Sequence, residues 1–290
     1  MIWVGGRLMV NEMSKQEILI GRDLKLNKEK LQDGGICCLI TGQSGSGKTF
    51  LTKKIINSLS EDNSSQIIVI DFEGDYFNLR ENNKFKLIGS DLDYLPEYKP
   101  DFNYELDKIK ELCDCIVSDE DINYVIDVSD LNHNAKLTKN FIIDFVENLI
   151  SFRKRTKSCC LFIDDLSNTC YRYSNSELDI DCKNAIVKLQ RLGRSRLVSS
   201  FFVSQRIKSL PKDITSKCNT ILMGKITSED FERNALYIGV NKNYFEEIVN
   251  YEFVAYGHGF DLEHPVIFND LLELNENDFE TIKKEYLVTP

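Results

Sequence analysis

Eight residues, 42–49, limit the fold of this chain more than any other segment. They read Gly-Gln-Ser-Gly-Ser-Gly-Lys-Thr and match the pattern G-x-x-x-x-G-K-[ST]. The apolar run 36–40 before them predicts a buried parallel strand, and the apolar spacing over 50–59 predicts a helix. A strand, a Gly-rich loop and a helix in this order are typical of a site that cradles a chain of phosphates.

Each residue of the loop has an expected role. The backbone N–H groups of a Gly-rich turn surround the phosphates, and the residues expected to do so are Gly42, Gln43, Ser44, Gly45, Ser46 and Gly47. Lys48 is expected to reach the β- and γ-phosphates, and Thr49 to offer its hydroxyl to Mg²⁺. The loop therefore predicts a nucleoside triphosphate as ligand rather than a chance Gly/Ser linker.

From residue 36 onward, strand patterns alternate with helical patterns. Further strands are predicted over 67–70, 85–89, 124–126, 159–163, 199–204 and 220–223, and further helices over 104–117, 137–152, 177–192 and 229–237. Two last strands, 253–256 and 266–268, are predicted to form an edge hairpin. The alternation indicates an α/β protein with a mostly parallel sheet and helices on both faces.

The chain is expected to have two parts. Residues 1–34 predict a small β-rich appendage, with a hairpin over 2–10 and a strand over 17–21, and 35–290 predict the main domain. No apolar run approaches the roughly 20 residues of a membrane span, and no signal peptide is recognisable. We therefore expect a soluble, cytoplasmic protein without a membrane partner, and its adjacent cysteines to be core residues.

Polar residues stand at the ends of four predicted strands. They are Asp71, Asp127, Asp164 and Gln205. Ligands of open α/β sheets bind at the carboxyl ends of the strands, so we expect these residues to lie near the phosphates. Asp164 follows an apolar run and fits a Walker B strand, whose carboxylate holds Mg²⁺ through water opposite Thr49.

Hydrolysis of the triphosphate needs a second carboxylate to polarise the attacking water. Asp165 is one candidate for this base, and Glu73 and Asp75, which follow another strand, are two rivals. The pattern leaves the choice open. Gln205 is expected to orient the water or to sense the γ-phosphate, although a simple polar strand cap would also explain it.

Two further blocks resemble the HerA/FtsK superfamily of ring-shaped DNA-pumping ATPases. Residues 70–76, Ile-Asp-Phe-Glu-Gly-Asp-Tyr, resemble its Asp-Pro-x-Gly-Glu-Tyr signature. Residues 193–196, Gly-Arg-Ser-Arg, followed by 203–206, Val-Ser-Gln-Arg, resemble its Gly-Arg…Ser-Gln-Arg-Pro stretch. The resemblance covers roughly 18–270 and is closest to HerA-like members.

The resemblance also has departures. Phe72 and Ile207 replace the prolines of the two blocks, and Asp75 and Asp165 stand where Glu is more usual. Residues 1–34 are too few for the complete N-terminal β-barrel of HerA proper. The compact form is more similar to stand-alone ATPases that package viral genomes or serve mobile elements.

The resemblance implies a P-loop NTPase fold of the RecA-like, additional-strand type. It further implies that ATP hydrolysis moves double-stranded DNA through a homo-hexamer, with a nuclease, portal or capsid protein as a further partner. An arginine should act on the neighbouring subunit's γ-phosphate, with Arg194 first, Arg196 second and Arg206 third in order of preference; a surface charge is the alternative. The net charge of −10 is unusual for a DNA-binding module, but a ring needs basic groups only along its channel.

Two other functions are alternatives to the motor. A non-translocating P-loop switch would share the nucleotide site, whereas a small-molecule kinase would need a lid with arginines and a second pocket. Two segments are candidate DNA contacts, the basic run 153–157 and the loop 167–176 with its tyrosines. The basic run is better explained as a helix C-terminus whose positive charges complement the helix dipole. The loop is explained equally well as a solvated loop without a role in DNA binding.

Overall fold

The structure of the protein is a computed structural model that describes residues 17–20, 24–82, 84–90, 99–153, 156–173, 176–227 and 248–269. Its strands are β1 Glu17–Leu19, β2 Lys25–Asn27, β3 Cys37–Thr41, β4 Ser65–Asp71, β5 Phe85–Gly89, β6 Phe102–Asn103, β7 Asn123–Asp127, β8 Ser158–Ile163, β9 Val198–Ser204, β10 Thr220–Met223, β11 Glu252–Gly257 and β12 Leu262–Asn269. Its α-helices are α1 Lys28–Gln32, α2 Lys48–Asp62, α3 Ile109–Ser118, α4 Ala135–Phe152, α5 Leu166–Thr169, α6 Glu177–Leu192 and α7 Lys212–Thr215.

The described strands form one large sheet and a separate β1–β2 pair. The order in the large sheet is β12-β11-β10-β3-β9-β8-β4-β7-β5-β6. The strands from β10 to β6 run parallel, whereas β11 and β12 extend one edge in antiparallel direction. β9 lies between β3, which precedes the loop 42–49, and β8, which precedes Asp164. This is the additional-strand arrangement, so the predicted fold class is confirmed.

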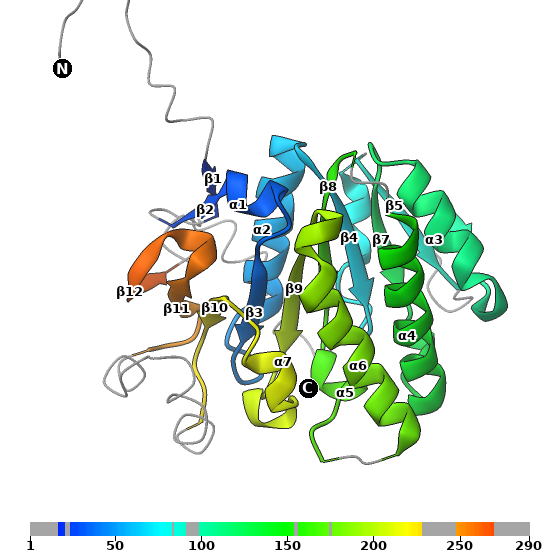
Figure 1. The fold of residues 1–290 in the computed structure, drawn as a ribbon. Coiled ribbons are helices and arrows are strands. Elements are labelled where there is room, and N and C mark those ends of the chain that lie inside the picture. The colour runs from blue at the N-terminus through cyan, green and yellow to red at the C-terminus, as the bar shows by residue number, and fades with distance from the viewer. Residues whose placement is uncertain are drawn as a thin grey trace, which may run out of the picture.

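Helices cover both faces of the sheet, with α3, α4 and α6 on the face turned toward the viewer in Figure 1. Along β4, Ile68 and Ile70 point into the core beneath these three helices. Ile67 and Val69 point the opposite way, into the core shared with α2. Because both faces are covered, all seven residues of β4 are buried, which explains its continuous apolar run.

The predicted strands from residue 36 onward are all confirmed, but one helix starts later than its pattern indicates. The helix predicted over 104–117 begins at Ile109, after a short 3-10 turn. Phe102–Asn103 pairs with β5, and the Tyr104 hydroxyl donates to the Asp130 carboxylate at 2.5 Å. These contacts hold the chain extended where its sequence alone favours a helix.

The N-terminal elements pack on the main domain. Ile18 of β1 and Leu26 of β2 are buried in the same core as Leu51 of α2. The division at residue 34 stays a prediction. The hairpin predicted over 2–10 and the helix predicted over 229–237 lie outside the described residues. In the part of the chain that the structure describes, no helix combines the length and apolarity that crossing a bilayer requires.

Candidate active site

The loop 42–49 leaves the carboxyl end of β3 and turns directly into α2. Gly45, at φ 75°, and Gly47, at φ 93°, adopt the left-handed conformation that glycine reaches without strain. A Cβ atom on Gly47 would also stand 2.5 Å from the ring of Tyr251, so a larger residue does not fit. The first N–H groups of α2 have no partner within the helix, which makes this end of the helix suited to an anion.

The Lys48 side chain contacts the start of the loop. Its ammonium donates to the carbonyl oxygen of Gln43 at 3.0 Å. Burial lowers the pKa of Lys48, while the charges of Asp164 and Asp165 raise it. The positive charge therefore lies between the loop and the end of β8, where a phosphate chain would pass.

The hydroxyl groups of Thr41, Ser46 and Thr49 lie in the loop 42–49 or directly before it. The Thr49 hydroxyl lies 3.4 Å from a carboxylate oxygen of Asp75, the long end of hydrogen-bond range. Ser46 Oγ and Thr41 Oγ1 are buried, and the described residues offer them no hydrogen-bond partner. A buried hydroxyl without a partner costs free energy, and a phosphate oxygen at the loop would supply one.

Carboxylates end the neighbouring strands β4 and β8. The Asp164 N–H donates to the carbonyl of Ile70 at 3.0 Å, which ties the two strand ends together. Burial and then the charge of Asp127 raise the pKa of Asp71 to about 7. Burial and then the charge of Asp71 raise the pKa of Asp164 well above its ordinary value. A bound cation would relieve this repulsion.

Asp71 folds the turn that follows β4. Its carboxylate accepts hydrogen bonds from the backbone N–H groups of Glu73 at 3.1 Å, Gly74 at 2.8 Å and Tyr76 at 2.7 Å. We expected Asp71 to face the phosphates, but its oxygens are used by this turn. Asp71 therefore acts by positioning Glu73 and Asp75.

A pocket of about 300 Å³ opens at the carboxyl ends of three strands, the end of the sheet at which the loop leaves β3. It is lined by Glu73, Asp165, Ser167, Asn168, Tyr171, Gln205, Arg206 and Ser209. Glu73 follows β4, Asp165 follows β8 and Gln205 follows β9, so the pocket unites three segments that are distant in sequence. Burial, followed by the charge of Asp165 and a hydrogen bond to it, raises the pKa of Glu73.

Asp165 occupies a strained position. Its φ is 39°, a left-handed value that is uncommon for a residue with a side chain. One carboxylate oxygen accepts from the Ser167 hydroxyl at 2.7 Å, and the other accepts from the Asn168 amide. Both carboxylate oxygens of Asp165 therefore accept hydrogen bonds from α5. Glu73 also lines the pocket, and its carboxyl group has Asp165 as partner.

The candidate arginines lie at opposite ends of β9. Arg206 follows the strand and lines the pocket, whereas Arg194 and Arg196 precede it. Seven residues of strand span about 23 Å, so Arg194 cannot reach the pocket of its own subunit. Its side chain is 77% exposed and pairs with Asp33 at 2.9 Å.

The basic run 153–157 contains a structural residue. Arg153 is buried directly after α4, and its guanidinium donates to the Gln66 side chain at 2.7 Å and to the Lys157 carbonyl at 2.6 Å. Arg153 therefore holds the core together and is not available to a phosphate backbone. Residues 154 and 155 lie outside the described residues.

Two residues of the site escaped the sequence reasoning. Asn168 stands three positions after Asp165, a spacing at which side chains on a helical turn meet, so a local signal existed. Tyr251 packs on Gly47, and its N–H donates to the Ser46 carbonyl at 3.0 Å. About 200 residues separate it from the loop, so no local pattern pointed to it.

Comparison with known proteins identifies the family. Residues 37–233 match the family model described as Helicase HerA, central domain. A search of curated proteins found no match.

Solved structures share the fold. The genome packaging NTPase B204 from Sulfolobus turreted icosahedral virus 2, in complex with AMPPCP, is 15% identical with a TM-score of 0.56, over 81% of this chain and 97% of that one. VirB4 of Thermoanaerobacter pseudethanolicus is 15% identical with a TM-score of 0.57, over 84% and 91%. The pCW3 conjugation coupling protein TcpA is 15% identical with a TM-score of 0.50, over 93% and 70%. At such identities the likeness shows the fold.

The match to the family model covers well over half of the 290 residues. It includes the loop 42–49, the turn after β4, Asp164 and Gln205. The chain therefore belongs to the family of the HerA helicase central domain, within the HerA/FtsK superfamily of P-loop ATPases.

Proposed function

We propose that this protein hydrolyses ATP and uses the energy to move double-stranded DNA through a homo-hexameric ring. The observation that carries the proposal is the meeting of Glu73, Asp165 and Gln205 in one pocket, at the same end of the parallel strands as the loop 42–49. Phosphoryl transfer to water needs a phosphate cradle, a cation and a group that orients the water. The pocket offers candidates for the group that orients the water. Candidates for the phosphate cradle and for the cation ligands lie at the same end of the sheet.

The residues present fit ATP with Mg²⁺. Lys48 would contact the β- and γ-phosphates, Thr49 would bind the ion directly, and Asp164 would hold it through water. The Ser46 hydroxyl without a partner and the repelling strand-end carboxylates support this fit. When bound, the ion would neutralise charge that develops on the phosphates.

The composition of the site supports a cation shared with the nucleotide. Within the described ranges, no three His, Cys, Asp or Glu side chains come together as a metal site of protein ligands alone. Mg²⁺ is usually held by one or two carboxylates together with substrate phosphates. The B204 structures, which share the fold, contain AMP, ATP-gammaS or AMPPCP.

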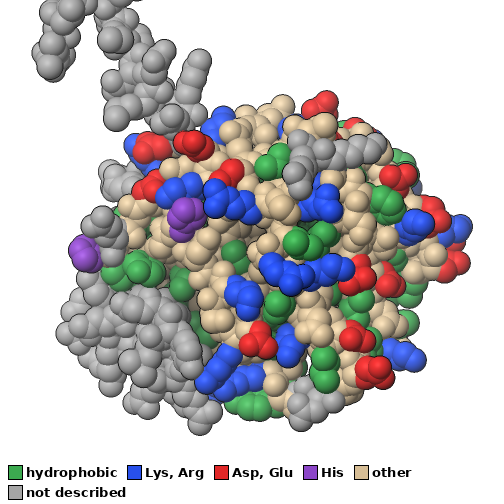
Figure 2. Space-filling model, viewed as in Figure 1, with side chains coloured by type: hydrophobic (Ala, Val, Ile, Leu, Met, Phe, Trp, Pro, Cys, Tyr) green, Lys and Arg blue, Asp and Glu red, His purple; other side chains and the backbone are tan. Residues whose placement is uncertain are grey.

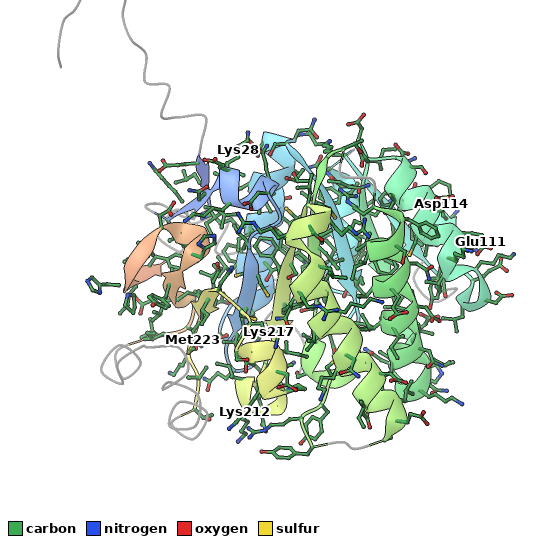
Figure 3. The ribbon with its side chains drawn as sticks, viewed as in Figure 1. Lys28, Glu111, Asp114, Lys212, Lys217 and Met223 are labelled. Carbon is green, nitrogen blue, oxygen red and sulfur yellow. The ribbon has the colours of Figure 1, made fainter. Side chains whose placement is uncertain are left out.

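A basic and aromatic surface beside the pocket supports DNA as the substrate. Figure 2 shows Lys and Arg side chains gathered on the face made by α6 and α7, and Figure 3 labels Lys212 on α7 and Lys217 just beyond it. Tyr171 and Tyr173 are about half exposed, and the Arg172 guanidinium stacks 5.3 Å from the Tyr173 ring centre. Lysines bind phosphates and exposed tyrosines stack on bases, so this surface suits nucleic acid.

In the proposed ring, Arg194 would act on the γ-phosphate bound to the neighbouring subunit. Arg194 lies before the amino-terminal end of β9, opposite the carboxyl ends where the pocket opens, so only a neighbouring subunit could bring it to the γ-phosphate. Its ion pair with Asp33 is solvent-exposed and therefore weak enough to be exchanged. We place the protein in the cytoplasm and include a nuclease, portal or capsid partner in the proposal, because B204 packages a genome.

The function is tested by measuring ATP turnover with and without double-stranded DNA, alongside mass by light scattering. We expect DNA to raise turnover severalfold and the mass to equal about six chains of 33.5 kDa. A monomer without a response to DNA would contradict the motor. An ATP turnover rate that is the same with and without DNA would instead favour a non-translocating switch.

A pair of variants sharpens this test. Arg172→Ala combined with Lys212→Ala should abolish the stimulation by DNA and leave the basal turnover intact, because both residues lie outside the catalytic pocket. Lys110→Ala removes an exposed charge from α3, near the opposite edge of the sheet, and should change neither quantity.

Arg194→Ala is expected to bind ATP normally but to lose nearly all hydrolysis, because an arginine supplied in trans contributes about 10³–10⁵ in rate. The matched control is Arg191→Ala, one turn earlier on α6 and also exposed. Mixing Arg194→Ala with Lys48→Ala subunits should restore part of the turnover, since some interfaces then pair an intact loop with an intact arginine. Absence of any recovery in mixed rings would argue against a role in trans.

A further inference from the structure

We propose that Cys170 and Cys182 form a disulfide under oxidising conditions and that this bond locks one wall of the pocket. Their sulfur atoms lie 3.0 Å apart, although the residues are 12 positions apart in the chain. Cys170 directly follows α5, and Cys182 lies in the second turn of α6. The sulfurs need to approach by about 1 Å to reach a disulfide bond length.

The thiol pair is buried but lies close to a point where the chain can open. Cys170 is 1% exposed and Cys182 is fully buried. α5 is a single turn of four residues, and Tyr171, directly after Cys170, is 48% exposed. The hydrogen bond to Cys182, and then burial, raise the pKa of the Cys170 thiol. The closed form therefore reacts slowly, and opening of this turn admits an oxidant.

A second close pair provides an internal comparison. The sulfurs of Cys37 and Cys218 lie 3.8 Å apart, and the Gln190 amide donates to both, at 3.2 Å and 3.7 Å. All nine cysteines are free in this structure, and Cys38, Cys159 and Cys160 are buried in sheet strands as the sequence predicts. The pair Cys170–Cys182 has the shorter separation, whereas Cys218 is the most exposed thiol of the two pairs.

The bond would act on the pocket through the residues on either side of Cys170. α5 carries Ser167 and Asn168, whose side chains hold the carboxylate of Asp165. Tyr171 lines the pocket, and the Arg172 N–H donates to the Ser209 carbonyl at 2.7 Å, on the segment that follows Gln205. A covalent link from Cys170 to α6 would hold this wall at its base and prevent movement that turnover requires.

The chemistry is thiol–disulfide exchange with a small disulfide such as oxidised glutathione. The Cys170 thiolate attacks one sulfur of the oxidant, breaks its S–S bond and releases one glutathione thiolate. The Cys182 thiolate then attacks Cys170 Sγ and releases the second. The protein loses two electrons and two protons, and the oxidant takes them up as two thiols.

The test uses the wild-type protein, treated with oxidised glutathione, alkylated and mapped by mass spectrometry. We expect a link between Cys170 and Cys182 with the loss of two hydrogen atoms, and a rise of about 5 °C in the unfolding midpoint that dithiothreitol reverses. Cys182→Ala should show neither change, whereas Cys37→Ala should show both. Absence of the link in folded wild-type protein, or an equal rise in Cys182→Ala, would overturn the proposal.

The effect on turnover rests on the proposed function and is read separately. We expect oxidation to lower ATP turnover severalfold in wild-type protein, and reduction to restore it, while Cys182→Ala stays unaffected. A reduced protein without turnover would refute the proposed function and leave the mapped link standing. A linked protein with unchanged turnover would refute the lock on the pocket wall.

Discussion

Lys48→Ala is expected to lower ATP turnover by at least about 100-fold, the loss that follows removal of one preorganised donor from a transition state. The Lys48 ammonium is the positive charge that lies near Asp164 and Asp165 and bonds the loop carbonyl of Gln43 at 3.0 Å. Without it, the phosphates would lose this positive charge while the strand-end carboxylates remain near them. Phosphate release measured at saturating ATP and Mg²⁺ checks the prediction.

The control for Lys48→Ala is Lys110→Ala, which removes an equal charge from the surface of α3. Both variants should fold, because alanine suits a helix and Lys48 pays a desolvation penalty in its present position. Turnover near the wild-type level in Lys48→Ala would show that the loop 42–49 is not the phosphate cradle.

Glu73→Gln is expected to retain ATP binding and to lose about 10²–10⁴-fold in turnover, the range for a general base. Both oxygens of Asp165 already accept hydrogen bonds from α5, and Asp75 lies beside Thr49, where the proposed Mg²⁺ would bind. Glu73 has one methylene more than either aspartate and lines the pocket. Its pKa is raised by burial and by Asp165, toward the pH at which a base works best.

The dependence on pH distinguishes the base from a positioning residue. A base must be deprotonated, so wild-type turnover should fall as the pH drops through the raised pKa of Glu73. Glu73→Gln should lack this acid limb. Asp165→Asn removes the charge that raises the pKa, so its limb should move to lower pH. An acid limb that persists unchanged in Glu73→Gln would assign the role to another carboxylate.

The elements of this fold were predictable because a strand buried on both faces reads as an unbroken apolar run. β4 and β8 have this form, and both end at the polar residues that the sequence singles out. The helix over 104–117 was misplaced at its start because two tertiary contacts, the pairing of β6 and the bond from Tyr104 to Asp130, outweigh local propensity. Neither contact leaves a trace in the nearby sequence.

The roles of the carboxylates in the site were also not predictable from the nearby sequence. Asp71, Glu73, Asp75 and Asp165 look alike as residues that follow strands. The structure separates them, because Asp71 folds a turn, Asp75 faces Thr49, and Asp165 is held by α5. A carboxylate's role depends on the donors that surround it, and most of these donors come from its three-dimensional neighbours.

The sequence by itself determined the phosphate-binding loop, the alternation of strands and helices, and the family. The loop and the alternation follow from contacts within about ten residues, where spacing alone dictates the backbone, and the family follows from short motifs along the chain. Only the tertiary structure decided that Glu73, Asp165 and Gln205 share a pocket, that Arg194 lies at the opposite end of β9 from this pocket, and that Cys170 meets Cys182. Such meetings depend on strand order and helix packing, which bring together residues that no local pattern connects.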